Sequence, residues 1–154
     1  MLAIDLGTSG CKGAVVSLLG RVVGAARAPV ETLHLPDGGA EQDPESVWRA
    51  VRTACREAVG RSGVAAADLR AVICTSQYSS VVPVDADGRP AMNMILWLDR
   101  RGAPERLRGL PGYPRGADSP LRLLRWLRVH GLPPVAGGLS LAHLRFIKHA
   151  RPGV

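Results

Sequence analysis

Residues 2–16 read LAIDLGTSGCKGAVV and form the most informative stretch of the sequence. Two short apolar runs flank a turn of glycine, threonine and serine, which predicts a β-hairpin. Thr8 and Ser9 add hydroxyl donors that suit phosphate oxygens. The glycines, which permit positive φ angles and a close approach of backbone N–H groups to a ligand, are Gly7, Gly10 and Gly13. The bend is therefore the candidate site.

Two charged residues flank this bend. Asp5 closes the first apolar run, and a lone carboxylate beside bound phosphates suits Mg²⁺, directly or through water. Lys12 opens the second run and supplies a compensating positive charge. The glycine spacing matches neither the dinucleotide-binding fingerprint nor the P-loop. The residues leave one alternative open, an ordinary hairpin whose Thr8 and Ser9 bond their own backbone.

Composition narrows the class of protein. With 154 residues, 46% hydrophobic and 21% charged, the chain suits one globular domain with its own core. No apolar run approaches the roughly 20 residues of a membrane span, and no secretory signal is evident, so we expect a cytoplasmic protein. The net charge of +7 comes from scattered arginines, so neither nucleic acid nor a membrane is an expected partner. Three widely spaced cysteines predict reduced thiols instead of a zinc site.

The first half of the chain predicts further strands and one long helix. Residues 21–30 favour a third strand, and 31–43 a loop. Asp43 is a suitable N-cap for a helix that ends near 60–63. Residues 69–75 are nearly all apolar, which favours a central strand covered on both faces. The stripe expected to face the sheet, with Trp48 and Ala58 beside it, is Val47, Val51, Cys55 and Val59.

The second half has weaker signals. Strands are expected at 81–85 and 94–97, with a turn at Asp87-Gly88, and 102–116 favours irregular structure. Two helices are expected, one from Ser119 and one from Ser140. Their apolar positions are Leu121, Leu124 and Leu127, and Leu141, Leu144 and Ile147. Residues 99–101 are either a helix start with surface charges or part of a site.

Four motifs follow one another along the chain: Asp5-Leu6-Gly7-Thr8-Ser9, Glu41-Gln42-Asp43-Pro44, Ser76-Gln77 and Ile95-Leu96-Trp97-Leu98-Asp99-Arg100-Arg101. In this order and at these intervals they resemble the amino-terminal part of the FGGY carbohydrate kinases, which include xylulose, glycerol and gluconate kinases. The resemblance is good over 2–102 and continues weakly to Pro152. It implies an α/β fold of the actin-like ATPase (ribonuclease H-like) type, a mixed sheet with helices on both faces.

The resemblance also implies an activity, transfer of the γ-phosphate of ATP to a sugar or polyol hydroxyl with Mg²⁺. Matched by position, Asp5 would help to hold the metal. The residues that would line the phosphates are Gly7, Thr8, Ser9, Gly10 and Lys12. Those that would bind the sugar are Gln77, Tyr78, Ser79, Trp97 and Asp99.

The chain departs from the family pattern in two respects. Xylulose kinases commonly carry Gln-Met-His-Gly, and glycerol kinases Gln-Arg-Glu, where this chain has Gln77-Tyr78-Ser79-Ser80, so a xylulose kinase-like assignment leaves the sugar open. Family members are also much longer, two-domain proteins. We therefore expect 1–154 to be a truncated amino-terminal, sugar-binding domain. The general-base aspartate is expected beyond Val154, so no catalytic residue is assigned and the fragment alone is expected to be inactive.

Two rival functions stay open on the sequence. One is an actin-like ATPase that activates a partner enzyme, such as the activators of 2-hydroxyacyl-CoA dehydratases. That class would show cluster-ligating cysteines, and Cys11, Cys55 and Cys74 do not form such a pattern. The other is a non-catalytic sugar-binding module. A homodimer of the full-length parent is also open.

Overall fold

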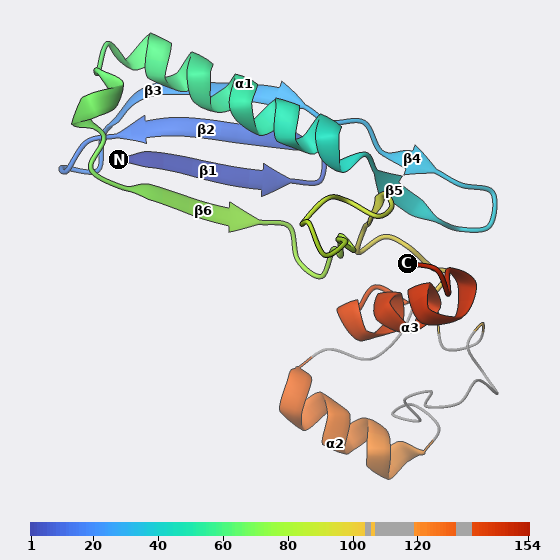
Figure 1. Ribbon diagram of the computed structural model, residues 1–154. Coiled ribbons are helices and arrows are strands. Elements are labelled where there is room, and N and C mark those ends of the chain that lie inside the picture. The colour runs from blue at the N-terminus through green and yellow to red at the C-terminus, as the bar shows by residue number, and fades with distance from the viewer. Residues whose placement is uncertain (104–105, 107–118, 132–136) are drawn as a thin grey trace. The chain divides into compact units, whose positions relative to one another are not determined.

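The computed structural model describes residues 1–103, 106, 119–131 and 137–154 (Figure 1). It divides into two compact units. Unit 1 comprises Met1–Thr32 and Gln42–Tyr78, and unit 2 comprises Leu33–Glu41 and Ser79–Val154. Across the described ranges, the chain has no helix with the length and hydropathy that a membrane crossing requires.

Unit 1 contains a four-stranded mixed sheet. Its order is β3-β2-β1-β6, with β2 antiparallel to both of its neighbours and β6 parallel to β1 (Figure 1). The strands are β1 Leu2–Gly7, β2 Gly10–Val16, β3 Val22–Pro29 and β6 Val72–Ser76. The structure confirms the hairpin predicted from the first stretch of sequence and the third strand that follows it.

The helix of unit 1, α1, spans Pro44–Ser62. The side chain of Asp43 accepts hydrogen bonds from the backbone N–H groups of Glu45 and Ser46, both at 3.1 Å. Proline at the first helical position lacks an N–H that would otherwise need a partner. Gly63 ends the helix in the left-handed conformation, with φ 67°. Both predicted ends are confirmed.

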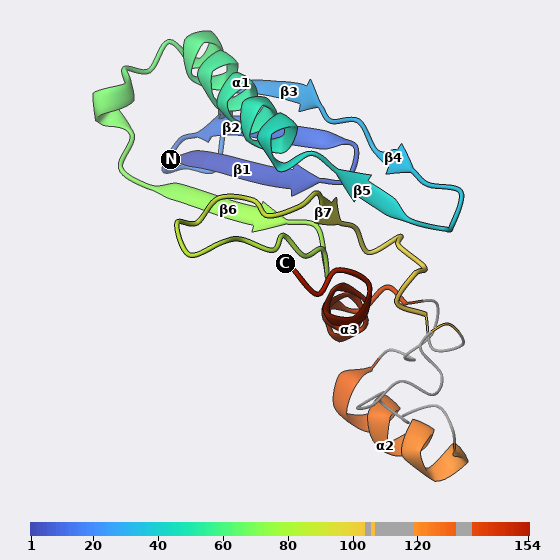
Figure 2. The same cartoon turned by 45° about the vertical axis from the view of Figure 1, so that its right-hand side comes forward.

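The face of α1 that meets the sheet differs from the prediction. Its buried residues are Ala50, Ala54 and Ala58, whereas Trp48 is exposed and the valine stripe is only half-buried. The reason is the closeness of helix and sheet, which Figure 2 shows along β2 and β3. A Cβ at Gly13 would lie 2.8 Å from the Ala54 carbonyl oxygen. Only small residues on both sides permit this approach.

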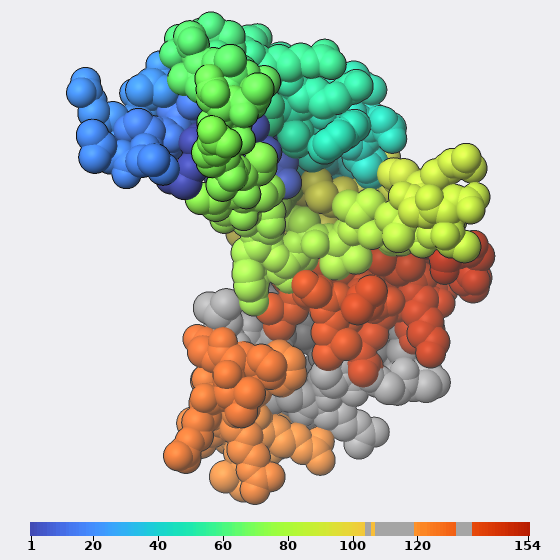
Figure 3. All heavy atoms as spheres, turned by 60° about the vertical axis from the view of Figure 1, so that its left-hand side comes forward, coloured from blue at the N-terminus to red at the C-terminus, as the bar shows by residue number. Residues whose placement is uncertain are grey.

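Strand β6 lies at the edge of the sheet, after the short 3₁₀ helix η1 (Ala66–Asp68). All five of its residues are exposed, and its spheres, green, lie at the surface in Figure 3. The prediction of a central strand covered on both faces is therefore wrong for this chain. An apolar run records a preference for burial, while neighbouring segments decide whether burial is achieved.

Unit 2 is built around a small sheet of order β4-β5-β7. The predicted loop over 31–43 contains two strands, β4 Leu33–His34 and β5 Ala40–Gln42, which pair antiparallel. Strand β7 covers Met94–Ile95. Only isolated bridges occur within 81–85, where Val81 pairs with Ile95, so the strand predicted there is absent from the described segment. The turn at Asp87-Gly88 is confirmed by φ 77° at Gly88.

Helices α2 (Pro120–His130) and α3 (Ser140–Ala150) lie where the sequence predicts them. Their apolar faces are shifted: Leu121 and Leu124 are exposed, and Leu123, Trp126 and Leu127 are the half-buried set. In α3 the buried residues are His143 and Ile147, whereas Leu141 and Leu144 are exposed. The prediction of irregular structure at 102–116 falls almost entirely outside the described residues.

Candidate functional site

The turn of the β1–β2 hairpin is two residues long. Gly7 pairs with Gly10, which leaves Thr8 and Ser9 at the tip. Gly10 has φ 148°, and a Cβ there would lie 2.4 Å from the carbonyl oxygen of Ala28 in β3. Glycine is therefore required at position 10 by both backbone conformation and space.

The other two glycines do not act as the sequence suggested. Neither Gly7 nor Gly13 has a positive φ. Gly13 faces α1, so its role is to let the helix approach the sheet. Of the three glycines predicted at the bend, Gly10 alone has a positive φ, and the close approach of a ligand to them stays a prediction.

A row of charged side chains crosses the sheet beside the turn. The strand register places Asp5 opposite Lys12 and Lys12 opposite Arg27. These side chains lie on the face of the sheet that is turned away from α1. Lys12 Nζ lies 2.9 Å from Asp5 Oδ2, with the Lys12 side chain exposed and that of Asp5 half-exposed. Arg27 donates to Ser9 Oγ at 3.1 Å. Two cations and one carboxylate thus surround the tip, a balance that favours an anionic ligand.

Two glutamines hold the turn in place. Thr8 Oγ1 donates to Gln77 Oε1 at 3.0 Å, and Gln77 Nε2 donates to Gln42 Oε1 at 3.3 Å. Gln42, which is buried, donates through Nε2 to the Thr8 carbonyl at 2.6 Å and to Thr32 Oγ1 at 3.2 Å. The backbone N–H of Gln77 donates to Leu6 O at 2.7 Å. Gln77 is thereby fixed against the tip that the sequence proposes as a phosphate site.

The residues at the tip fit Mg²⁺ in the way that kinases use it. Asp5 is a single, accessible carboxylate, and Mg²⁺ needs only one or two carboxylates when phosphates and water complete its shell. No group of three or more histidine, cysteine or acidic side chains arranged for a metal occurs among the described residues. Any metal here would therefore depend on the phosphates it accompanies.

The predicted sugar residues fall in both units. Gln77 and Tyr78 end the second segment of unit 1, and Tyr78 is exposed. Ser79, Trp97 and Asp99 belong to unit 2. Ser79 has φ 59°, unusual for a residue with a side chain, and its hydroxyl lies 3.1 Å from that of Ser140 at the start of α3.

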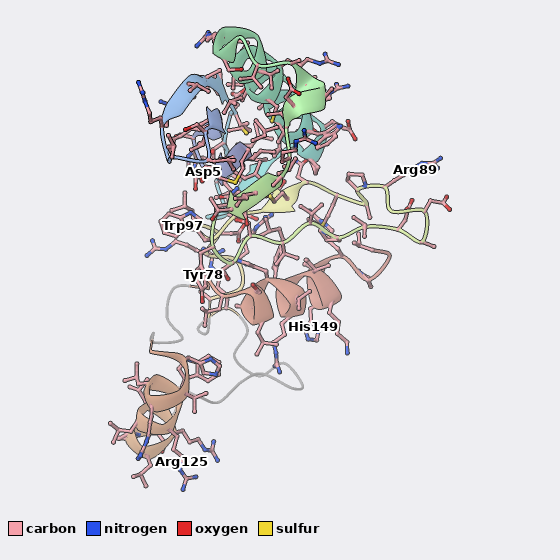
Figure 4. The ribbon with its side chains drawn as sticks, turned by 90° about the vertical axis from the view of Figure 1, so that its left-hand side faces the viewer. Asp5, Tyr78, Arg89, Trp97, Arg125 and His149 are labelled. Carbon is pink, nitrogen blue, oxygen red and sulfur yellow. The ribbon has the colours of Figure 1, made fainter. Side chains whose placement is uncertain are left out.

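Trp97 and Asp99 have opposite environments. The Trp97 side chain, labelled in Figure 4, belongs to a residue that is 45% exposed, whereas Asp99 is fully buried at 0%. The Asp99 carboxylate accepts from the Ala40 N–H at 3.0 Å and from the Arg101 guanidinium at 2.7 Å. Its oxygens are thus bonded inside unit 2, and a direct contact with a sugar stays a prediction that this geometry does not favour.

Sequence reasoning missed the partners of Asp99. Arg101 lies between two carboxylates, with its NH2 nitrogen 2.6 Å from Glu41 Oε1, and all three side chains are buried. Burial by itself would lower the pKa of Arg101, but its hydrogen bonds to Asp99 and Glu41 outweigh that cost and raise it. The interpretation of 99–101 as a helix start with surface charges is wrong for Asp99 and Arg101. The signal that could have found the cluster was the pairing of acidic and basic residues in two of the four motifs.

His143 of α3 is buried in the same unit, and neither ring nitrogen has a hydrogen-bond partner among the described residues. Burial lowers its pKa, Asp99 opposes that shift and Arg101 reinforces it. The imidazole is therefore neutral near pH 7.

Comparison with known proteins assigns a family. The model of the FGGY family of carbohydrate kinases, N-terminal domain, matches residues 1–108. A glycerol kinase of Delftia acidovorans is 37% identical over 105 residues, 68% of this chain and 21% of that protein. The chain thus spans about one fifth of the length of that relative.

Solved structures share the fold. A crystal structure of a xyloylose kinase from Brucella ovis matches 98% of this chain and 29% of its own, with TM-score 0.80 and 24% identity. A ligand-bound xylulose kinase from Lactobacillus acidophilus matches 99% of this chain and 29% of its own, with TM-score 0.79 and 20% identity. The predicted actin-like ATPase fold with its mixed sheet is confirmed. The chain belongs to the FGGY family of carbohydrate kinases, whose N-terminal domain its residues 1–108 match.

Proposed function

We propose that this chain is the amino-terminal, sugar-binding part of an ATP-dependent kinase that phosphorylates a hydroxyl of a small sugar or polyol. The observation that carries the proposal is the hairpin tip, where two glutamines fix the Thr8-Ser9 turn and two cations flank it. A fixed turn with surplus positive charge suits the terminal phosphates of a nucleotide.

In this proposal the residues of the tip act by position and charge. Lys12 and Arg27 neutralise phosphate charge, and the backbone of the Thr8-Ser9 turn lies against the phosphates. Asp5 takes part in holding Mg²⁺ when the nucleotide brings the metal, which then supplies charge neutralisation for phosphoryl transfer. Lys12 must release Asp5 for this, and an exposed ion pair costs only about 0–1 kcal/mol to separate.

The acceptor end of the proposal rests on Gln77, Tyr78, Ser79 and Trp97. The relative named above is a glycerol kinase, and the solved structures with this fold include a xylulose kinase, so the proposed substrate class is a polyol or ketose with vicinal hydroxyls. Asp99 contributes through its bonds inside unit 2. The general base is not among the residues assigned to the site, and turnover is expected to need more than these 154 residues.

A binding experiment tests the nucleotide half of this proposal. Titration calorimetry measures ADP binding to the chain with and without Mg²⁺, in the wild type and in Asp5→Asn. We expect Mg²⁺ to tighten binding in the wild type and to have no effect in Asp5→Asn. Asp68→Asn, an exposed acid of η1 in the same unit, is the matched control and should behave as the wild type. Equal responses to Mg²⁺ in all three proteins would remove Asp5 from the metal site.

A further inference from the structure

Unit 2 contains a cluster of three buried charged side chains, Glu41, Asp99 and Arg101, which we call the Arg101 cluster. Arg101 donates to Glu41 Oε1 at 2.6 Å and to Asp99 Oδ2 at 2.7 Å, and its Nε lies 3.0 Å from the same Asp99 oxygen. The second oxygen of Glu41 accepts from Asn93 at 3.0 Å. The guanidinium therefore joins β5 to the segment that follows β7.

That segment is a tight turn with Trp97 at its tip. The Asp99 N–H donates to Leu96 O at 2.9 Å, so Trp97 and Leu98 are the two central residues of the turn. Both are partly exposed. Ala40 of β5 bonds both ends, because its carbonyl accepts from the Leu96 N–H and its own N–H donates to Asp99 Oδ2, each at 3.0 Å. The base of the turn is thus fixed while its tip is presented outward.

The turn is also held on other sides. A Cβ at Gly138 would lie 2.5 Å from the Trp97 carbonyl oxygen, so the backbone before α3 packs directly on the tip. A Cβ at Gly102 would lie 2.7 Å from the carbonyl oxygen of Ala142 in α3. Arg101 stacks on the ring of Phe146, with 4.6 Å between its Cζ and the ring centroid.

Stability alone does not explain this cluster. Buried ion pairs gain little over well-packed apolar residues of similar size, because removing the charges from water offsets their attraction. What a planar, bidentate guanidinium supplies is geometry, since it accepts few orientations of its carboxylate partners. Here the geometry being fixed is that of the turn that carries Trp97.

We propose that Arg101 and Glu41 are positioning residues that fix the orientation of the Trp97 side chain, which the proposed function places against the substrate. The inference rests on that function for the identity of the ligand. The orientation of Trp97 itself follows from unit 2 and can be measured without any ligand.

The test uses the 154-residue chain with Trp97 as its single tryptophan, since Trp48→Phe and Trp126→Phe leave one fluorophore. Arg101→Lys keeps the charge but loses the fork that joins both carboxylates. Glu41→Gln leaves no buried charge unpaired that would unfold the protein, because the Asp99–Arg101 pair remains and the cluster becomes neutral. Arg89→Lys is the matched control, an exposed arginine of the same unit at the far end of its loop in Figure 4.

Three quantities are measured for each variant: time-resolved fluorescence anisotropy of Trp97, the thermal unfolding midpoint, and the apparent Kd for glycerol and for D-xylulose from Trp97 fluorescence. In Arg101→Lys and Glu41→Gln we expect a larger amplitude of fast Trp97 motion than in the control. Apparent Kd should rise about tenfold, because a Trp97 side chain that samples several orientations must be ordered when the ligand binds. Arg101→Met, which removes the charge as well, should show more fast Trp97 motion than Arg101→Lys. That order would show that the charge of Arg101 contributes to holding Trp97.

Two results separate this inference from the proposed function. Unchanged Trp97 anisotropy in folded Arg101→Lys and Glu41→Gln overturns the positioning role, whatever happens to the unfolding midpoint. Absence of any glycerol or xylulose response in the wild type, or an unchanged Kd in Trp97→Phe followed by tyrosine fluorescence, counts against the proposed sugar site. The anisotropy comparison still decides the positioning role in that case.

Discussion

Replacing Gly13 with alanine should destabilise unit 1, because the structure leaves no room for the added methyl group. The new Cβ would lie 2.8 Å from the Ala54 carbonyl oxygen and 3.0 Å from its carbonyl carbon, and both are backbone atoms of α1. The helix must therefore move away from β2. Overpacking of this kind costs about 1–3 kcal/mol, whereas loss of glycine flexibility in the unfolded chain returns about 0.4–1 kcal/mol. We expect a net loss of about 1–2 kcal/mol.

Gly60→Ala is the matched control for this prediction. Gly60 lies in α1, and a methyl group added there would have nothing within 4 Å, so alanine should stabilise the helix by about 0.5–1 kcal/mol. The assay is urea unfolding followed by fluorescence of Trp48, which lies in α1, with Trp97 and Trp126 replaced by phenylalanine. If Gly13→Ala proves as stable as Gly60→Ala, the close contact between helix and sheet is not present in solution.

Three further predictions test other parts of the molecule. Asp43→Ala should lower the stability of unit 1 by about 1 kcal/mol at pH 7 in urea unfolding. Because the Ser46 side chain and then backbone N–H groups hold the pKa of Asp43 below 3.8, the difference should be complete above that pH, and its charge-dependent part should be lost as pH falls through the lower folded-state pKa. Burial lowers the pKa of His143 from 6.5, so wild-type thermal stability should fall with pH below about 6.5, as the unfolded chain then binds the extra proton, and His143→Met should remove that slope. Cys74, exposed on β6, should react with a thiol reagent before Cys11, whose pKa burial raises; mass spectrometry of partly labelled protein gives the order, and earlier labelling of Cys11 would contradict the packing of α1.

The elements that the sequence predicts well are those defined by neighbouring residues. The β1–β2 hairpin follows from a polar turn between two apolar runs. The ends of α1 follow from Asp43, Pro44 and Gly63, each of which acts within one helical turn. Local chemistry is sufficient in these cases, so the strand and helix bounds agree closely with the structure.

The inner face of α1 could not be predicted in the same way. Valines and alanines occupy adjacent rows of the helix, and hydrophobicity alone favours the valine row. The alanine row faces the sheet because β2 and β3 present glycines there, at Gly13 and Gly24. The inner face therefore depends on which strand packs against each turn of the helix. The spacing of apolar residues within the helix carries no information about that packing.

The residues that hold the candidate site in place could not be predicted from their sequence neighbours either. The hairpin tip was predicted from its own residues, but Gln42, which bonds the Thr8 carbonyl, lies 34 positions further along the chain. Glu41 and Arg101 are 60 positions apart. A run such as Asp99-Arg100-Arg101 is usually solvated, and burial of Arg101 is tolerable because Glu41, distant in sequence, joins Asp99 as a partner of the guanidinium.

The bond between Thr8 and Gln77 has a consequence for the proposed kinase. A threonine hydroxyl has one proton, and in the structure Thr8 donates it to Gln77 Oε1. A phosphate oxygen is an acceptor, so it can bond this hydroxyl only if the proton turns away from Gln77. The Gln77 oxygen would then accept readily from another donor, such as a substrate hydroxyl. If Thr8 binds phosphate and Gln77 binds the sugar, a substrate hydroxyl replaces the hydrogen bond that Gln77 loses when phosphate binds Thr8. Each ligand should therefore raise the affinity of the chain for the other.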